Sequence, residues 1–283
     1  MNKKWFIAAG LCIVIGVAGM VVYGAPWNQQ VMKETTAINK KWTVTRGQLQ
    51  NLKVDSSDDV SILFTPGSGD QGTIRISGEV QTKVADQIHN ARIENGKLII
   101  QSKPAPSLSF LSFTPDLDQT ITVEMPAGET LADLQVDIHS GNVKLQDASV
   151  ENTSITATSG TAEITNLRST HLIANLTSGN FIANQLTADM ELKLTSGDVT
   201  IRDYSGNGLL SLTSGESNIT QRTVSNLEVN SDSGDVNIKQ ALDFKGVYNV
   251  HSDSGSINTP ESVPGAASVI KVETTSGDID ISK

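Results

Sequence analysis

Cysteine is almost absent from this chain of 283 residues, in which Cys12 is the only one. No disulfide can therefore form within the chain, and this fits a cell surface on which disulfides are not routine. Aromatic residues are also scarce, at 4% of the chain. A compact enzyme with a bulky core contains more of them, so the composition indicates an elongated protein rich in β-structure.

Basic residues are too few to balance the acidic ones, since 21 Lys and Arg stand against 31 Asp and Glu for a formal net charge of −10. The phosphates of nucleic acids require a protein surface of the opposite sign. We therefore expect no nucleic acid among the partners.

One dipeptide, Ser-Gly, recurs through the second half of the chain at intervals of 18 to 22 residues. A fixed dipeptide with a period near 20 is typical of proteins built from stacked repeats. The eight copies are Ser140-Gly141, Ser159-Gly160, Ser178-Gly179, Ser196-Gly197, Ser214-Gly215, Ser233-Gly234, Ser254-Gly255 and Ser276-Gly277.

Apolar residues keep fixed places around each Ser-Gly, with polar residues between them. This alternation predicts a strand on each side of the dipeptide, with one face in water. The position four before the Ser holds Val136, Ile155, Ala174, Leu192, Leu210, Val229, Val250 and Val272. The position two after the Gly holds Val143, Ala162, Phe181, Val199, Ser217, Val236, Ile257 and Ile279. Further apolar residues predict a third side of the repeat that touches the core, and these are Leu167, Leu186, Tyr204 and Leu242.

Two architectures agree with this pattern. In a solenoid, Ser-Gly is a corner and each copy lies on the one before, whereas in a meander it is a hairpin turn. Tight hairpins favour Asn-Gly or a leading Gly, and a nearly constant period is needed only to close a coil. We therefore predict an all-β fold, a single-chain parallel β-solenoid (β-helix) of coils of about 19 residues over residues 131–283, preceded by one N-terminal transmembrane helix.

Residues 5–23 contain no charged side chain, and a helix of this length spans ~28 Å, about one hydrocarbon core. A cleaved signal peptide is the other interpretation, but its apolar region is usually only about 7–15 residues long. The candidate cleavage site also places Tyr23 where a small residue belongs. We expect an uncleaved anchor with residues 1–4 in the cytoplasm, because of Lys3 and Lys4, and the β region outside the cell.

Residues 24–46 are interpreted as a juxtamembrane linker with several basic residues and the tryptophans Trp27 and Trp42. They either contact anionic headgroups or form a solvated tether. Residues 47–130 are expected to be an irregular β region that covers one end of the stack, with one or two helical turns within 83–91. The segment Ser107–Phe113 is either part of this cover or an exposed apolar patch.

The sequence contains no signature of catalysis, and the four histidines are far from one another in the sequence. A column of eight serines is better explained as corner hydroxyls than as nucleophiles, because catalysis needs one activated Ser. We expect no catalytic residue, no cofactor and no metal ligand. The histidines are His89, His139, His171 and His251.

Acidic residues near the corners are the best remaining candidates for a site. Stacked carboxylates ~4.8 Å apart repel each other, and Ca²⁺ would relieve that repulsion. The glycine-rich signature of calcium-binding solenoids is absent, however, so we interpret these residues as ordinary solvated turns. They are Asp198, Asp232, Asp235, Asp253 and Asp278.

Over residues 47–283 the chain resembles a bacterial β-strand-repeat family of adhesin-like proteins. The resemblance rests on the strand end Val123–Gly128 and on the units Thr195–Val199, Asp232–Val236 and Thr275–Ile279. The single anchor and the layout are similar to those of a membrane protein from a Gram-positive cell-envelope stress operon. The resemblance implies an extracytoplasmic membrane protein linked to envelope stress, with no catalytic residues to carry over.

Two functions are compatible with these features. The first is a non-enzymatic binding or scaffolding module of the bacterial cell envelope, and the alternative is a carbohydrate-active β-helix enzyme that acts on an envelope polysaccharide. The expected partners are the cell membrane, through the N-terminal helix, and an envelope protein or a second copy. Either would dock on the C-terminal edge strand around Ile279 and Ile281, which we expect to end the stack without a cap. The alternative is that charge and fraying alone keep this edge unpaired and the protein monomeric.

Overall fold

The computed structural model describes residues 35–102 and 117–283. The predicted anchor and the segment Ser107–Phe113 lie outside these ranges. Within them, no helix combines the length and the apolar character needed to cross a membrane. The elements are one helix, α3 (Thr82–Asn90), and the strands β1 (Thr35–Thr45), β2 (Asn51–Ser56), β3 (Asp59–Thr65), β4 (Gln71–Gln81), β5 (Ile93–Glu94), β6 (Lys97–Ser102), β7 (Asp118–Glu124), β8 (Leu131–Ile138), β9 (Val143–Gln146), β10 (Ser149–Ala157), β11 (Ala162–Ser178), β12 (Phe181–Ser196), β13 (Val199–Ser205), β14 (Gly208–Ser214), β15 (Ser217–Gln221), β16 (Leu227–Ser233), β17 (Val236–Lys239), β18 (Val247–Ser254), β19 (Ile257–Asn258), β20 (Val269–Ser276) and β21 (Ile279–Ser282).

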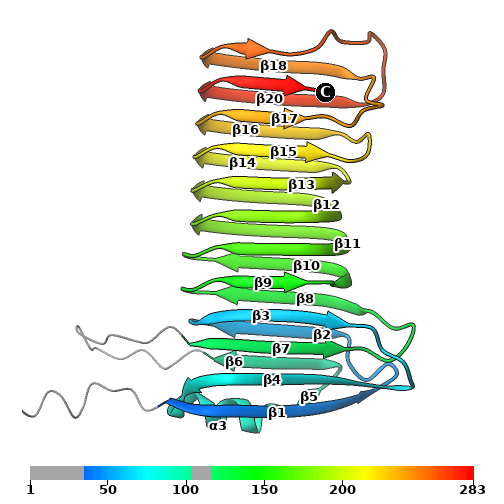
Figure 1. Ribbon diagram of the computed structural model, residues 1–283, viewed down its shortest axis with the longest axis vertical. Coiled ribbons are helices and arrows are strands. Elements are labelled where there is room, and N and C mark those ends of the chain that lie inside the picture. The colour runs from blue at the N-terminus through cyan, green and yellow to red at the C-terminus, as the bar shows by residue number, and fades with distance from the viewer. Residues whose placement is uncertain (1–34, 103–116) are drawn as a thin grey trace, which may run out of the picture.

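From β8 onward, the strands pair in parallel and each coil lies flat on its neighbour (Figure 1). Equivalent positions of successive coils are side by side, so that Ala174 pairs with Leu192 and Leu192 with Leu210. A meander would have paired these strands antiparallel. The predicted parallel β-solenoid is therefore confirmed.

The Ser-Gly dipeptides form one corner of the coil, and only glycine fits there. Their glycines have φ values between +92° at Gly141 and +156° at Gly255, a region that residues with a Cβ rarely adopt. A Cβ on Gly197 would also lie closer than 3.0 Å to the carbonyl oxygen of Gly179 in the preceding coil. The dipeptide is therefore repeated because the corners stack directly on each other.

The predicted core columns point inward. Phe181 is completely buried, and so are Ala174 and Ala183 in the columns beside it. On the third side of the coil Leu186 and Tyr204 are also fully buried. A large side chain is accommodated here because the small ones around it leave room.

Leu242 does not belong to the third side, although its sequence position predicted this. Its side chain is 84% exposed, whereas Ala241 and Phe244 beside it are buried. The chain leaves the regular path after β17 and forms a turn in which the N–H of Phe244 bonds to the carbonyl of Ala241. This turn places Phe244 in the core in place of Leu242.

The N-terminal end of the stack is closed by antiparallel strands and a helix. Strand β1 pairs antiparallel with β4, and β4 with β7. Helix α3 contacts β1, β4 and β6 and buries Val84, Ala85 and Ile88. The helical turns predicted within residues 83–91 are thus confirmed, and they cover the end of the core.

Part of the predicted linker is folded, which corrects the interpretation of residues 24–46. Residues 35–45 form β1, and residues 24–34 lie outside the described part of the chain. Trp42 is buried at 7% exposure, and its indole Nε1 donates to the carbonyl of Ala91 at 2.9 Å. It therefore fixes β1 to the segment after α3 and does not contact lipid headgroups.

The spatial order of the coils differs from their order in the chain at both ends. The coil of β2 and β3 lies between β6 and β7 on one side and β8 and β9 on the other. The coil of β20 and β21 lies between β16–β17 and β18–β19. Figure 1 accordingly shows the C-terminus inside the stack, with β18 beyond it.

The expected C-terminal edge strand is therefore wrong. The strand of Ile279 and Ile281 pairs on both sides, with β17 and with β19, and both side chains are buried. The long connection from Thr259 to Ser268 lets the last coil fold back into the stack. The free edge at this end belongs to β18 and β19.

Candidate functional site

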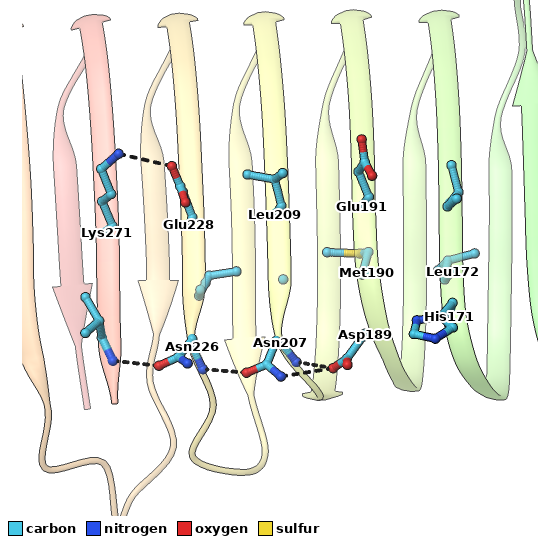
Figure 2. A pocket seen from close by; sticks show the side chains of 14 residues that line it. His171, Leu172, Asp189, Met190, Glu191, Asn207, Leu209, Asn226, Glu228 and Lys271 are labelled. Atoms are coloured by element: carbon cyan, nitrogen blue, oxygen red, sulfur yellow. Dashed lines mark hydrogen bonds and ion pairs between the residues drawn. The ribbon is translucent and has the colours of Figure 1, made fainter. Parts of the chain in front are cut away.

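A shallow groove of about 530 Å³ crosses five neighbouring coils on the outer face of one sheet (Figure 2). Its residues come from the second halves of β11 and β12 and from β14, β16 and β20. Because the strands are parallel and in register, one side chain of each coil falls in the same column of the groove. The groove is thus a consequence of the stacking, and its character depends on what each coil places in that column.

The floor of the groove is the outer side of the hydrophobic core. Leu172, Met190 and Leu227 line it and are themselves buried. Between the last two, the same column holds Gly208, and the ring of Tyr204 fills the space beneath this glycine. The floor is therefore apolar and rigidly supported.

Tyr204 is held in the core as a neutral phenol. Its hydroxyl donates toward the carbonyl oxygens of Asn207, at 2.6 Å, and Ala188, at 3.2 Å. Burial, with a smaller contribution from Asp189, raises the pKa of Tyr204 well above the usual value for tyrosine. The phenol supports the loop before β14 and is not a candidate proton donor to a ligand.

A ladder of hydrogen bonds forms one border of the groove (Figure 2). The carboxylate of Asp189 accepts from the backbone N–H of Asn207 at 2.9 Å and from its side-chain amide at 3.1 Å. The side-chain oxygens of Asn207 and Asn226 accept from the backbone N–H groups of Asn226 and Val269, respectively. Each side chain thus satisfies a backbone donor of the next coil, so this border is fixed.

Apolar and charged side chains share one column along the middle of the groove. The outward residues of five successive coils are Ile173, Glu191, Leu209, Glu228 and Lys271. Ile173 is 44% exposed, a high value for a large aliphatic side chain on a sheet. A ligand would meet an apolar surface flanked by charges of both signs.

The two glutamates of the groove are paired with lysines. Glu228 accepts from Lys271 at 3.0 Å, and Glu191 from Lys193 at 2.6 Å. The hydrogen bond from Lys271 is the main cause that lowers the pKa of Glu228, and a second bond from Asn230 adds to it. A general acid needs a raised pKa, so Glu228 has the opposite of the property that glycoside hydrolysis requires.

Sequence analysis did not identify this groove. Glu228 and Lys271 are 43 residues apart, more than two repeats, and they meet only because the last coil is inserted next to β16. The aliphatic residues Ile173, which is exposed, and Leu209, which is half-buried, stand at outward positions where polar residues are expected. These two residues are the feature of the sequence that could have indicated the groove.

The corner acids have a structural explanation. The carboxylates of Asp198, Asp235 and Asp278 accept from the backbone N–H groups of the next coil, at 3.0, 2.8 and 2.7 Å. The N–H of Ser256 is the main cause that lowers the pKa of Asp278. No group of three or more His, Cys, Asp or Glu side chains suited to a metal ion occurs in residues 35–102 and 117–283.

Asp232 and Asp253 do not belong to this column. They lie on β16 and β18, the strands that run into their Ser-Gly corners, and both side chains point to the outer face. Two of the four histidines face carboxylates, since His139 approaches Asp55 at 3.1 Å and His251 approaches Asp253 at 2.9 Å.

The other two histidines lie elsewhere. His89 contacts the carbonyl of Ala85 within α3 at 2.8 Å, and His171 lines the groove. The four histidines thus lie in four different surroundings.

Comparison with known proteins supports the fold assignment. A putative adhesin from Bacteroides fragilis is 12% identical, with 88% of this chain and 98% of that one covered, and its crystal structure superposes with a TM-score of 0.52. A putative adhesin from Parabacteroides distasonis is 16% identical, with coverages of 86% and 97% and a TM-score of 0.48. A search of curated proteins gives no significant match. At these identities the first likeness shows the fold alone.

A family model covers nearly the whole β region. The model described as Toastrack DUF4097 matches residues 49–282, which include every coil from β2 to β21. The repeated Ser-Gly corners, the parallel stack and this match agree with one another. The chain belongs to the Toastrack DUF4097 family.

Proposed function

We propose that this protein is a non-enzymatic binding module and that the groove across β11, β12, β14, β16 and β20 is its binding surface. The observation that carries the proposal is the composition of the groove. Its floor is apolar, and the exposed Ile173 and the half-buried Leu209 lie along it. Glu191 and Glu228 are held in ion pairs, and Asp189 accepts hydrogen bonds from Asn207. Such a surface fits an extended ligand with apolar and charged groups, whereas hydrolysis of a polysaccharide requires a proton donor.

We further propose that residues 5–23 hold the module at the outer side of a bacterial cell membrane and that it serves in the envelope stress response. The support for the anchor is the uncharged stretch of 19 residues, long enough to span the hydrocarbon core. Lys3 and Lys4 on its short side favour a cytoplasmic N-terminus. The support for the envelope is the likeness to adhesin-like proteins and the low cysteine content.

A photo-crosslinking amino acid at the groove tests the binding surface in intact cells. We expect a crosslinker in place of Ile173 to capture one partner, and capture to be lost when Leu209→Asp is added, because a new carboxylate opposes the apolar contact. A crosslinker in place of Thr200, which lies on the outer face of β13, is the control and should capture nothing specific. Equal capture at both positions, or capture that is indifferent to Leu209→Asp, would contradict the proposal.

The same cells test the anchor. The full-length chain should fractionate with membranes, and protease added after removal of the wall should degrade the β region. A mature protein that begins near Pro26 and is found in the medium would show that residues 5–23 are a cleaved signal peptide.

A further inference from the structure

The coil of β18 and β19 ends the stack with its core uncovered. Ile257 of β19 is 45% exposed, whereas Ile279, in the same column one coil inward, is 1% exposed. Tyr248 and Val250 of β18 continue the core columns and are only partly buried. Within the described residues β18 forms a strand ladder only with β20, and β19 only with β21. The connection after β19 reaches the other edge of β18 at Tyr248, whose backbone N–H donates to the Oγ of Ser262 at 2.9 Å. No strand lies on that edge of β18 or of β19.

This end lacks the protection that the other end has. At the N-terminal end α3 covers the core, and the outermost strand β1 carries Lys40 and Lys41. Lysine and proline are common devices that prevent edge strands from pairing with another chain. Strand β18 contains neither, over eight residues.

Charge also favours approach at this end. The chain as a whole has a formal net charge of −10, which opposes contact between two copies. Between Val247 and Asn258, however, Asp253 is the only acidic residue and no Lys or Arg occurs. When two copies of β18 pair antiparallel from Asn249 onward, beyond the bond between Tyr248 and Ser262, Asp253 faces uncharged residues of the partner strand.

We propose that the β18–β19 end binds the same end of a second copy through a two-fold axis. The uncovered surface has two arms, β18 and β19, on either side of the corner at Gly255. A single added strand would cover β18 and leave Ile257 exposed, whereas a second coil with the same outline covers both arms. Because the opposite end is closed by α3 and β1, the assembly stops at a dimer and does not grow into a filament.

Cysteine crosslinking of the full chain in detergent micelles tests this interface, with Cys12→Ser as the background. Asn249→Cys places a thiol on the outer face of β18, and Thr43→Cys places one on the free edge strand β1 as a matched control. A short bis-maleimide should link two copies through position 249 and not through position 43. Adding Val250→Lys should abolish the link, because two ammonium groups would be brought to the two-fold axis.

The melting temperature shows whether each variant is folded. Val250→Lys should change it little, since the side chain lies at an open end, and Ile257→Lys is a second variant with the same expected loss of crosslinking. Absence of the link at position 249, an equal link at position 43, or a link that survives both lysine variants in folded protein would overturn the proposal. The outcome is independent of the groove, so the two proposals fail separately.

Discussion

Replacing Phe181 with alanine is expected to lower the free energy of unfolding by about 3–5 kcal/mol, the usual cost of deleting a buried phenylalanine. Phe181 has no exposed surface, and Ala174 and Ala183 in the columns beside it are too small to fill the space that it leaves. The adjacent coils cannot collapse into the cavity, because their corner glycines already touch. The cavity therefore persists in the folded state.

Chemical unfolding of the variant measures this cost. Ile182→Ala is the matched control, because Ile182 precedes Ala183 on β12 and points to the outer face of the coil. The control should lose much less stability than Phe181→Ala. An unchanged melting temperature for Phe181→Ala would show that this ring does not fill the core.

A single methyl group at a corner glycine is expected to be as damaging. Gly197→Ala should cost more than about 4 kcal/mol, a loss that few single substitutions reach. The backbone there has φ +126°, and the new Cβ would collide with the carbonyl of Gly179. This clash is relieved only if the two coils move apart, and that movement breaks the hydrogen bonds between them.

Gly128→Ala separates the two causes of this loss. Gly128 also has a positive φ, of +78°, but no atom lies within 4 Å of the position of its Cβ. Its substitution should therefore show only the backbone strain, roughly 1–2 kcal/mol. Similar unfolding free energies for Gly128→Ala and Gly197→Ala would contradict the stacked corners.

The sequence was sufficient to predict what is local to one coil. The alternation around Ser-Gly determined which residues point inward, because the period of a strand is two residues. The column of Phe181 and the helical turns near residue 83 follow from such local patterns. Equal spacing then implied the stacking of equivalent positions, which the pairing of Ala174 with Leu192 confirms.

The sequence was not sufficient to predict which coils are neighbours at the ends. The last coil pairs with β17 through Asn237 and Asp280, a contact that skips one repeat. Both orders bury the same apolar columns, so hydrophobic pattern alone does not distinguish them. The groove residue Lys271 and the open edge at β18 depend on this order, which is why both were missed.

Trp42 shows a related limit. A tryptophan among lysines near a predicted membrane anchor is typical of a segment that contacts lipid headgroups. Its burial arises because β1 pairs with β4 and α3 returns over it, and these partners are distant in the sequence. Pairing of β1 with β4 sets Trp42 opposite Ile74, 32 positions further along the chain.

Engineered disulfides show whether the last coil is inserted between β16–β17 and β18–β19. In a Cys12→Ser background, Asn237→Cys with Asp280→Cys should form a disulfide, because these residues are paired neighbours at a strand spacing of ~4.8 Å. Asn258→Cys with Asp280→Cys should also link, and it would do so in either order of coils. No link should form between Asn237→Cys and Asn258→Cys, which lie two coils apart. A disulfide between those two residues, without one between 237 and 280, would show that the coils follow the chain in order and that the last coil is not inserted.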